Sequence, residues 1–295
     1  RKSDFEEIST VAIIIISCFF AFTYFLAAVL GPALFFFTPE GVAVSVMRMN
    51  GVPILIGVRN IFYIPVTPNV GAVFLFLVGV FLLCLLAAWK FKESFHYVIG
   101  KSSLRPVEKL FNNFLVAMPI ITNMLFVAVL VIINLQSSMG VPTVPSPETE
   151  KLNPFKLFFI INYDVLMEEI GFRIIPIGFF LIIYVFESQA INGIALSVKE
   201  RLKLVFTAFL VPDRAKKTVG LKTVSEFGIR KGICRSEWTM IFITAFAWGL
   251  AHFLVGGWTV GKITSVFIDG LVFGLVYIAY GAYAPILLHW FFNYY

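Results

Sequence analysis

Long uncharged stretches alternate with short charged ones along this chain of 295 residues. Four uncharged stretches are long enough to cross a hydrocarbon core of about 30 Å as helices: 11–37, about 70–89, about 113–135 and 238–261. Three more cross only if polar residues are admitted, namely 155–186, 263–283 and 284–295. The last reaches only about 18 Å at about 1.5 Å per residue, which predicts a partial or truncated span. The pattern predicts an all-α, polytopic transmembrane helix bundle of about seven to eight membrane segments.

The first stretch, from Val11 to Phe37, predicts a retained helix. Its 27 uncharged residues exceed the apolar region of a cleavable signal peptide. The chain begins with Arg1 rather than Met and stops two residues after Asn293, so the sequence leaves open whether both ends are complete.

Composition agrees with a membrane protein. Hydrophobic residues make up 59% of the chain, 34 residues are Phe, and the mean hydropathy is +0.92, whereas soluble domains are only about half apolar. The three cysteines, Cys18, Cys84 and Cys234, lack the paired spacing of a zinc site or a redox motif. We predict an integral, multi-pass membrane protein whose cysteines have no chemical role.

Charge in the connections predicts the orientation, because Lys and Arg near span ends prefer the cytoplasm. Residues 90–109 include five basic and two acidic residues, and residues 188–236 include ten basic and three acidic ones. Stretches 38–70 and 136–154 have only three basic residues together. With single crossings, this pattern places the amino terminus and both basic connections in the cytoplasm.

The basic segment 188–236 is too short and too polar to bury a core, which predicts a cytoplasmic loop rather than a separate domain. Its positive charge suits the anionic lipids of the bilayer, and it fits the topology without a nucleic-acid partner. Residues 193–211 repeat apolar side chains at helical spacing, which predicts an amphipathic helix at the membrane interface. We expect this helix to serve topology rather than substrate capture.

The stretch "DVLMEEIGFR" at 164–173 places four ionisable side chains inside an apolar segment. Each costs at least a few kcal/mol there, which favours a function. Glu169 and Arg173 are four residues apart, so they share a helix face and can pair. Glu168 points about 100° away and stays free to act as a general base. Asp164 lies one turn before Glu168, either as a network member or at the outer end of the helix.

Two of the three histidines also lie in apolar segments, His252 in "FAWGLAHFLV" and His289 in "PILLHWFFNYY". A polar ring in the membrane needs partners inside the bundle, which favours function over packing. His289 and Asn293 are four residues apart and can direct N–H donors to one point, as an oxyanion hole requires. Trp248 lies one turn before His252, whereas His96 lies in the first basic connection and should be solvated.

In this order, the residues resemble the three motifs of the CPBP family, also called Abi, of CAAX proteases and bacteriocin-processing enzymes. The motif EExxxR corresponds to Glu168, Glu169 and Arg173, FxxxH to Trp248 through His252, and HxxxN to His289 through Asn293. Each motif alone is weak, but all three in order within apolar segments are fairly specific. The resemblance includes the CAAX prenyl endopeptidase II and covers about 155–295, whereas residues 1–154 match nothing.

The resemblance implies an intramembrane endopeptidase with a conical or cavity-containing catalytic core, which hydrolyses a membrane-associated peptide or protein, with or without a lipid. In family terms, Glu168 with His252 activates water, His289 and Asn293 hold the oxyanion, and Glu169 with Arg173 sets the geometry. The core would be residues 155–295, including the basic loop, and residues 1–154 would add membrane helices. We expect no cofactor; the alternative is a zinc ion held by Glu168, His252 and His289.

Two features of the sequence fit the family pattern less closely. Trp248 in place of Phe is a conservative exchange that we expect to be harmless. Counted along straight helices, Glu168 and His252 lie about 20 Å from opposite faces of the membrane, which leaves the depth of the site open. Segment 155–186 is too long for one straight span, and Gly171 and Pro176 predict a break just past the first motif.

Other classes of protein stay open. A proton- or ion-coupled transporter also places acidic residues in the membrane, but the spans have no inverted repeat. An aspartyl intramembrane protease would use Asp164 and Asp269, yet Phe267 stands where that class expects glycine. A non-catalytic scaffold, or an ion-pair network with a purely structural role, is the remaining alternative.

Overall fold

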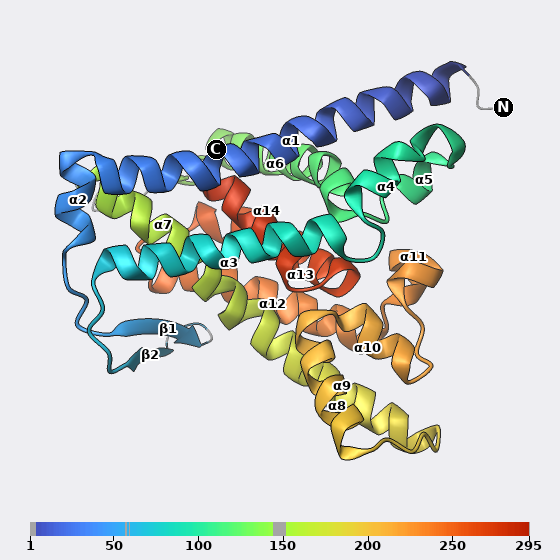
Figure 1. Ribbon diagram of the computed structural model, residues 1–295. Coiled ribbons are helices and arrows are strands. Elements are labelled where there is room, and N and C mark those ends of the chain that lie inside the picture. Colours follow the sequence, from blue (N-terminus) through green and yellow to red (C-terminus); the bar gives the residue numbers. More distant parts are fainter. Residues whose placement is uncertain (1–3, 57, 59, 144–151, 295) are drawn as a thin grey trace.

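The computed structural model describes residues 4–56, 58, 60–143 and 152–294, and it consists mainly of helices (Figure 1). The long helices are α1 (Asp4–Phe37), α3 (Val70–Lys90), α6 (Phe114–Ser138), α7 (Pro154–Glu169), α8 (Ile175–Ile191), α12 (Arg235–Leu254), α13 (Gly261–Tyr280) and α14 (Tyr283–Tyr294). The shorter pieces are α2 (Pro39–Ser45), α4 (Phe95–Gly100), η1 (Ser102–Leu104), α5 (Val107–Leu110), η3 (Ile170–Ile174), α9 (Val198–Leu210), α10 (Pro212–Thr218) and α11 (Val224–Gly232). This architecture confirms the predicted all-α polytopic bundle.

Within the described residues, six helical stretches are long and apolar enough to cross a membrane. They are Glu6–Phe37, Val70–Gly100, Phe114–Ser138, Pro154–Ile191, Arg235–Leu254 and Gly261–Tyr280. Each coincides with a predicted segment. The seventh, α14, has 12 residues, which is about 18 Å at about 1.5 Å per residue. The described part of this helix therefore covers only part of a hydrocarbon core of about 30 Å.

The spanning helices turn large apolar side chains outward. On α1, Phe19, Phe22 and Phe25 are each more than half exposed, as are Leu83 on α3 and Val127 on α6. Exposed apolar surface spread over several long helices is suited to lipid rather than to water. The protein is therefore an integral, multi-pass membrane protein.

Helix α14 is buried among the spans, where it contacts α3, α6, α7 and α13. Every residue from Tyr283 to Trp290 is buried. The Tyr24 hydroxyl of α1 donates to the Leu287 carbonyl (2.7 Å), and the Trp290 indole donates to the side-chain oxygen of Asn162 on α7 (3.0 Å). These contacts fix the rotation of α14 and hence the direction of its polar side chains.

Helices α7 and α8 are joined through a π-helical turn, η3, without interruption. The predicted break is therefore wrong in form, although its position is correct. Pro176 has no N–H to donate to the carbonyl of Phe172, four residues earlier, so a regular helical ladder cannot pass this point. Single π turns often mark functional sites, and this one follows directly after Glu169.

Segment 188–236 packs against the bundle and shares a hydrophobic cluster with it. The segment folds into α9, α10 and α11, and it buries Leu204, Ala208, Ala215 and Val219 in a cluster with residues of α8, α12 and α13. Its few apolar residues gather on the faces that meet the bundle, an arrangement that average polarity does not reveal. The segment is an extension of the bundle.

Helix α9 confirms a helix within the predicted amphipathic stretch. It begins at Val198, where the side chains of Ser197 and Glu200 form a capping box. Leu202 and Phe206 remain more than half exposed on its outer side. The position of this helix at the membrane interface stays a prediction.

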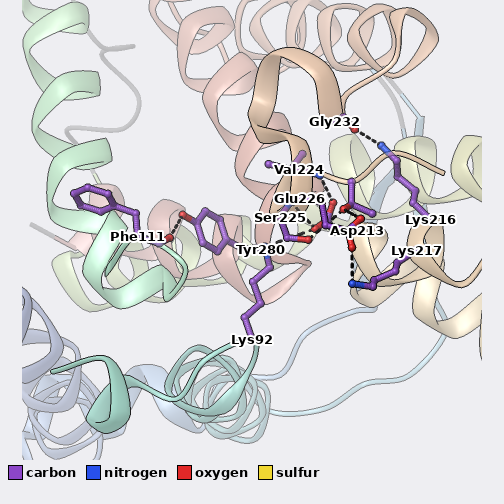
Figure 2. A network of polar contacts seen from close by, with 11 residues as sticks. Lys92, Phe111, Asp213, Lys216, Lys217, Val224, Ser225, Glu226, Gly232 and Tyr280 are labelled. Atoms are coloured by element: carbon purple, nitrogen blue, oxygen red, sulfur yellow. Dashed lines mark hydrogen bonds and ion pairs between the residues drawn. The ribbon is translucent and has the colours of Figure 1, made fainter. Parts of the chain in front are cut away.

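A network of polar contacts ties the basic segment to one end of the bundle (Figure 2). Asp213 on α10 accepts hydrogen bonds from the backbone N–H groups of Val224 (2.6 Å) and Ser225 (3.0 Å) at the start of α11. The Lys92 ammonium group, just past α3, lies 3.8 Å from Asp213 and 5.0 Å from the ring centroid of Tyr280 at the end of α13. The network therefore holds α10 and α11 against the ends of α3 and α13.

Lys216 and Glu237 form a fully buried ion pair that joins α10 to α12. The Lys216 ammonium group lies 2.8 Å from the Glu237 carboxylate and donates to the Gly232 carbonyl (2.5 Å). The same carboxylate accepts from the backbone N–H of Cys234 (2.7 Å). One carboxylate thus neutralises a buried cation and satisfies an N–H group at the start of α12.

A β-hairpin between α2 and α3 was not predicted. Strand β1 (Val52–Ile56) pairs antiparallel with β2 (Asn60–Ile64). Its β-branched and aromatic residues are typical of strands. The stretch is much shorter than the membrane spans, and a search for long uncharged segments does not detect it. The Tyr163 hydroxyl of α7 donates to the Pro53 carbonyl, which holds the hairpin against the spanning helices.

We expect Glu237→Gln to destabilise the protein. The change leaves the Lys216 charge buried without a counter-charge, which costs about 3–5 kcal/mol in buried pairs. The midpoint of thermal unfolding in detergent micelles should fall. Lys217 and Glu226 form an exposed pair, so Glu226→Gln is a matched control that should leave the midpoint nearly unchanged. Equal falls in both variants would contradict the assigned role of the buried pair.

Candidate active site

The six predicted site residues come from four elements that meet inside the bundle. Helix α7 ends with Glu168 and Glu169, η3 contains Arg173, α12 contains His252, and α14 contains His289 and Asn293. The π turn follows the two glutamates directly, and the buried packing of α14 directs the last two residues toward them. Residues far apart in the sequence thus surround one place in the bundle.

Glu169 is the buried centre of this group. One of its carboxylate oxygens accepts from Arg173 Nη1 (3.2 Å) and lies 2.9 Å from His289 Nδ1. Both Glu169 and Arg173 are fully buried. The predicted pairing of these two residues is therefore present, with His289 as a further partner. Because a carboxylate only accepts hydrogen bonds, we assign a proton to Nδ1 of His289.

Glu168 faces two imidazole rings. Its Oε1 lies 3.9 Å from His252 Nε2, and its Oε2 lies 3.7 Å from His289 Nε2. Both separations are too long for a direct hydrogen bond, and each leaves room for a bridging water or a substrate atom. The Glu168 side chain is 17% exposed and that of Glu169 is 0% exposed. Glu168 is therefore the carboxylate of the pair that a substrate can reach.

The backbone fixes the protonation pattern of His252. Its Nδ1 lies 3.1 Å from the carbonyl oxygen of Trp248, one turn earlier on α12. A carbonyl only accepts, so we assign the proton to Nδ1, which leaves Nε2 of the neutral ring as an acceptor. The acceptor nitrogen is the one that faces Glu168.

Trp248 is a site residue whose role sequence reasoning missed. Its indole Nε1 donates to Glu168 Oε2 (2.7 Å), a bond that the Phe of the family motif cannot form. The Arg173 guanidinium lies 3.7 Å from the centroid of its ring, within the range of a cation–π contact. The expectation that Glu168 is free of partners is therefore wrong. The expectation that the exchange of Phe for Trp is harmless stays a prediction. The sequence contained a signal for this hydrogen bond, because the N–H of a buried indole usually donates to an acceptor.

A cavity of about 770 Å³ opens beside Glu168. The polar side chains on its wall include those of Asp164, Glu168, His252, Lys262, His289 and Asn293. Pro53 and Ile61 of the β-hairpin and Trp258 of the connection between α12 and α13 also line it. The cavity therefore joins the candidate residues to a segment of the chain that precedes all three motifs.

Asn293 lies on the cavity wall, one turn beyond His289. Its side-chain N–H₂ group donates to the carbonyl of Ile161 on α7 (3.1 Å). A primary amide has two N–H bonds. One of them is thus used to orient the side chain, and the other stays available for a ligand.

The two membrane aspartates lie in different surroundings. Asp164 lines the cavity one turn before Glu168, whereas Asp269 on α13 is not among the lining residues. One carboxylate oxygen of Asp269 is buried without a hydrogen-bond partner among the described residues. The cavity therefore does not present the pair of aspartates that an aspartyl protease needs. His96 is exposed, as expected.

The zinc alternative concerns Glu168, His252 and His289. Within the described parts of the chain, no three His, Cys, Asp or Glu side chains group closely enough to hold a metal ion. The nitrogen and oxygen ligands of zinc lie about 2.0–2.2 Å from one ion. Here the two histidines approach different oxygens of Glu168, and one of these oxygens already accepts a hydrogen bond from Trp248.

The second half of the chain matches a known protein family. Residues 151–295 match the Rce1-like family model, described as type II CAAX prenyl endopeptidase Rce1-like. The matched range contains all three motifs and begins just before α7, so α1 to α6 and the hairpin lie outside it. No curated protein and no solved structure matches the chain.

We expect Trp248→Phe to lower the turnover of peptide cleavage. The variant keeps an aromatic ring beside Arg173 but removes the N–H that holds Glu168. Hydrogen bonds to charged groups contribute about 1.5–3 kcal/mol, which corresponds to a fall in kcat of roughly ten- to a hundredfold. Separate measurement of kcat and KM checks this, since KM should change little. Trp238→Phe, on the more exposed part of α12, is the control. Equal kcat values in the two variants would disprove the assigned role.

Proposed function

Because residues 151–295 form a domain of the type II CAAX prenyl endopeptidase (Rce1-like) family, we propose that this membrane protein is an intramembrane endopeptidase. It hydrolyses a peptide bond of a membrane-associated peptide or protein, with or without an attached lipid. Glu168 and His252 activate the attacking water, and His289 and Asn293 stabilise the oxyanion.

The observation that carries the proposal is the arrangement around Glu168. Its Oε1 is the oxygen without a tryptophan partner, and it lies 3.9 Å from the acceptor nitrogen of His252. A water molecule between these two atoms can donate one hydrogen to each of them. The oxygen lone pairs of such a water point away from both groups, toward the cavity. This geometry supports Glu168 as the general base.

The proposed reaction proceeds in two proton transfers. The water oxygen attacks the carbonyl carbon of the scissile bond as Glu168 takes one of its protons, so a C–O bond forms and the carbonyl oxygen becomes an oxyanion. Glu168 then returns the proton to the amide nitrogen as the C–N bond breaks. The products are a carboxylic acid and an amine. His252 orients the water through its second hydrogen.

The oxyanion role places a requirement on His289. Its Nδ1 hydrogen is directed at Glu169, so a donor at Nε2 requires that both ring nitrogens carry hydrogen. The positive charge of that ring is balanced by Glu169 at 2.9 Å and Glu168 at 3.7 Å. The second N–H of Asn293 is the other donor. Two preorganised donors of this kind are what an oxyanion hole requires.

Glu169 and Arg173 serve as positioning residues in this proposal. Neither is exposed, so neither reaches a substrate. Glu169 orients His289, and Arg173 lies beside Trp248, which in turn holds Glu168. The pair therefore sets the direction of both functional groups on the cavity wall.

We propose a mechanism without a metal ion, and the alternative is zinc held by Glu168, His252 and His289. The tryptophan hydrogen bond to Glu168 supports the metal-free version, because it occupies an oxygen that a metal ligand set would use. In the metal-free mechanism, Asn293 donates a hydrogen bond to the oxyanion and the buried Arg173 positions Trp248.

We expect Glu168→Gln and His252→Ala each to abolish most peptide cleavage. Loss of a general acid–base group typically lowers the rate about 10²- to 10⁴-fold. Cleavage of candidate membrane peptides by each purified variant in detergent or liposomes measures the effect. Glu187→Gln and His96→Ala make the same changes at exposed positions and should retain wild-type rates. Full cleavage by both site variants would refute the proposed function.

Removal of metal ions should leave cleavage intact. Purified enzyme treated with a strong chelator and then freed of it by dialysis should keep its initial rate, because the proposed mechanism uses only protein groups. Cleavage that disappears after the treatment and returns with added zinc would favour the zinc alternative.

A further inference from the structure

Two adjoining cavities lie where one end each of α3, α6 and α13 meets the basic segment. The first, of about 420 Å³, is enclosed by the residues after α3, by α10 and by the start of α11. The second, of about 400 Å³, lies among α6, α11 and α13. Lys92, Asn112 and Ser225 line both cavities, so one ligand can reach from the first into the second. None of the candidate active-site residues is among the described residues that line them.

The first cavity has three basic side chains on its wall, those of Lys92, Arg214 and Lys217. The Lys92 ammonium group lies 3.8 Å from Asp213, and that of Lys217 lies 2.6 Å from Glu226. Arg214 is exposed, and no carboxylate in the described part of the chain forms an ion pair with it. The charge of Arg214 is therefore available to an anion from outside the chain.

The acidic groups of this cavity are already engaged by the protein. Glu93 pairs with Arg105, and the two oxygens of Asp213 accept backbone N–H groups of α11 at 2.6 and 3.0 Å. The cavity wall and its ion-pair partners thus have one more positive charge than negative charges. The basic residues counted are Lys92, Arg105, Arg214 and Lys217, and the acidic ones are Glu93, Asp213 and Glu226. A phosphodiester group, which has a single negative charge at neutral pH, matches this surplus.

Lys92 is held in a rare backbone conformation at the junction of the two cavities. Its φ of 59° makes it the single non-glycine residue with a positive φ in the described chain. Residues with side chains rarely adopt this left-handed region, and such strain occurs mainly at functional sites, where the surrounding structure holds it. In this conformation the ammonium group lies 5.0 Å from the ring centroid of Tyr280, toward which Figure 2 shows it directed. A cation is thus fixed at the point where a polar cavity meets an apolar one.

The second cavity is an apolar groove that runs along two spanning helices. On α13 its wall extends from Tyr280 back to Val272, about 12 Å at about 1.5 Å per residue. Its apolar lining includes Ala117, Ile120 and Ile121 of α6 and Val272, Leu275 and Val276 of α13. Both helices are long and apolar enough to cross the membrane. The groove therefore enters the hydrocarbon region from the ends of these helices.

We propose that the two cavities together bind one phospholipid with a net negative charge. Its phosphate group lies in the first cavity against Lys92, Arg214 and Lys217, and one acyl chain lies in the groove between α6 and α13. Basic pockets between transmembrane helices bind the headgroups of anionic lipids in other membrane proteins. A soluble anion would satisfy the cations and leave the adjoining groove without a partner. The site is separate from the candidate active site, so this inference does not depend on the proposed function.

The charge of the first cavity favours an anionic headgroup over a zwitterionic one. Phosphatidylcholine has the same phosphate but adds a quaternary ammonium group, whereas Glu93 and Asp213 already have partners within the protein. Phosphatidylglycerol has the phosphate without the added cation. A comparison of these two lipids with identical chains therefore separates recognition of charge from simple insertion of an acyl chain.

Competition on the unsubstituted protein tests the site directly. The purified protein, in an uncharged detergent, is saturated with a fluorescent phosphatidylglycerol, and unlabelled phosphatidylglycerol, phosphatidylcholine or glycerol phosphate is added, with the lipids at equal mole fractions in the micelles. Phosphatidylglycerol should compete at least about tenfold better than phosphatidylcholine, and glycerol phosphate should compete little. Equal competition by the two lipids, or no saturable binding, would overturn the inference. Competition by glycerol phosphate as strong as that by phosphatidylglycerol would reject the lipid in favour of a soluble phosphate.

Arg214→Gln tests the cation that has no ion-pair partner in the described chain. Because Arg214 is exposed, the variant should fold, and its Kd for phosphatidylglycerol should rise about fivefold. Arg201→Gln is the matched control, since it removes an exposed charge on α9 outside both cavities. Its Kd should equal that of the wild type. Equal Kd values in the two variants would attribute binding to general surface charge and contradict the proposed site.

Ile120→Trp tests the groove. Ile120 is an exposed residue of α6 that lines the second cavity, so an indole there occupies space that the acyl chain needs. Binding of phosphatidylglycerol should weaken several-fold. Ile183→Trp makes the same change at an exposed position of α8 outside both cavities and should bind as the wild type does. Wild-type affinity in Ile120→Trp would exclude an acyl chain from the groove and reject the proposed lipid site.

Discussion

The buried charge of Glu169 is the constraint on which the rest of the site depends. An unpaired charge inside a membrane costs at least a few kcal/mol, and here Arg173 and His289 approach it to 3.2 and 2.9 Å. Its partners lie on η3 and α14, so neutralising one carboxylate fixes three elements relative to one another. Glu168, the preceding residue, is thereby directed at the cavity. The contacts that neutralise this buried charge therefore also set the geometry of the candidate site.

Local sequence spacing predicts much of this arrangement. The spans follow from uncharged length alone, and the pairing of Glu169 with Arg173 follows from four-residue spacing on one helix. The meeting of His252 and His289 beside Glu168 was expected from a family resemblance and from the cost of polar rings in lipid, and the structure places them there. These features can be predicted from the residue types and spacing within single segments.

The features that escaped prediction depend on contacts between distant segments. The packing of α9 and α10 against α8 and α13 depends on a few apolar residues, and the average polarity of 188–236 does not reveal it. The hydrogen bond from Trp248 to Glu168 depends on how α12 is rotated against α7. A count of residues along straight helices placed Glu168 and His252 at different depths in the membrane. That count assumed that each helix is perpendicular to the membrane and begins at its surface. These contacts are determined by the packing of helices, which residue spacing within one segment does not predict.

The buried position of α14 has a consequence for biosynthesis. This helix contributes His289 and Asn293, and α3, α6, α7 and α13, which surround it, all precede it in the chain. During translation, the earlier spans enter the bilayer while the ribosome has yet to deliver either residue. The group of polar side chains around Glu168 is therefore assembled only after α14 has packed against the helices that precede it.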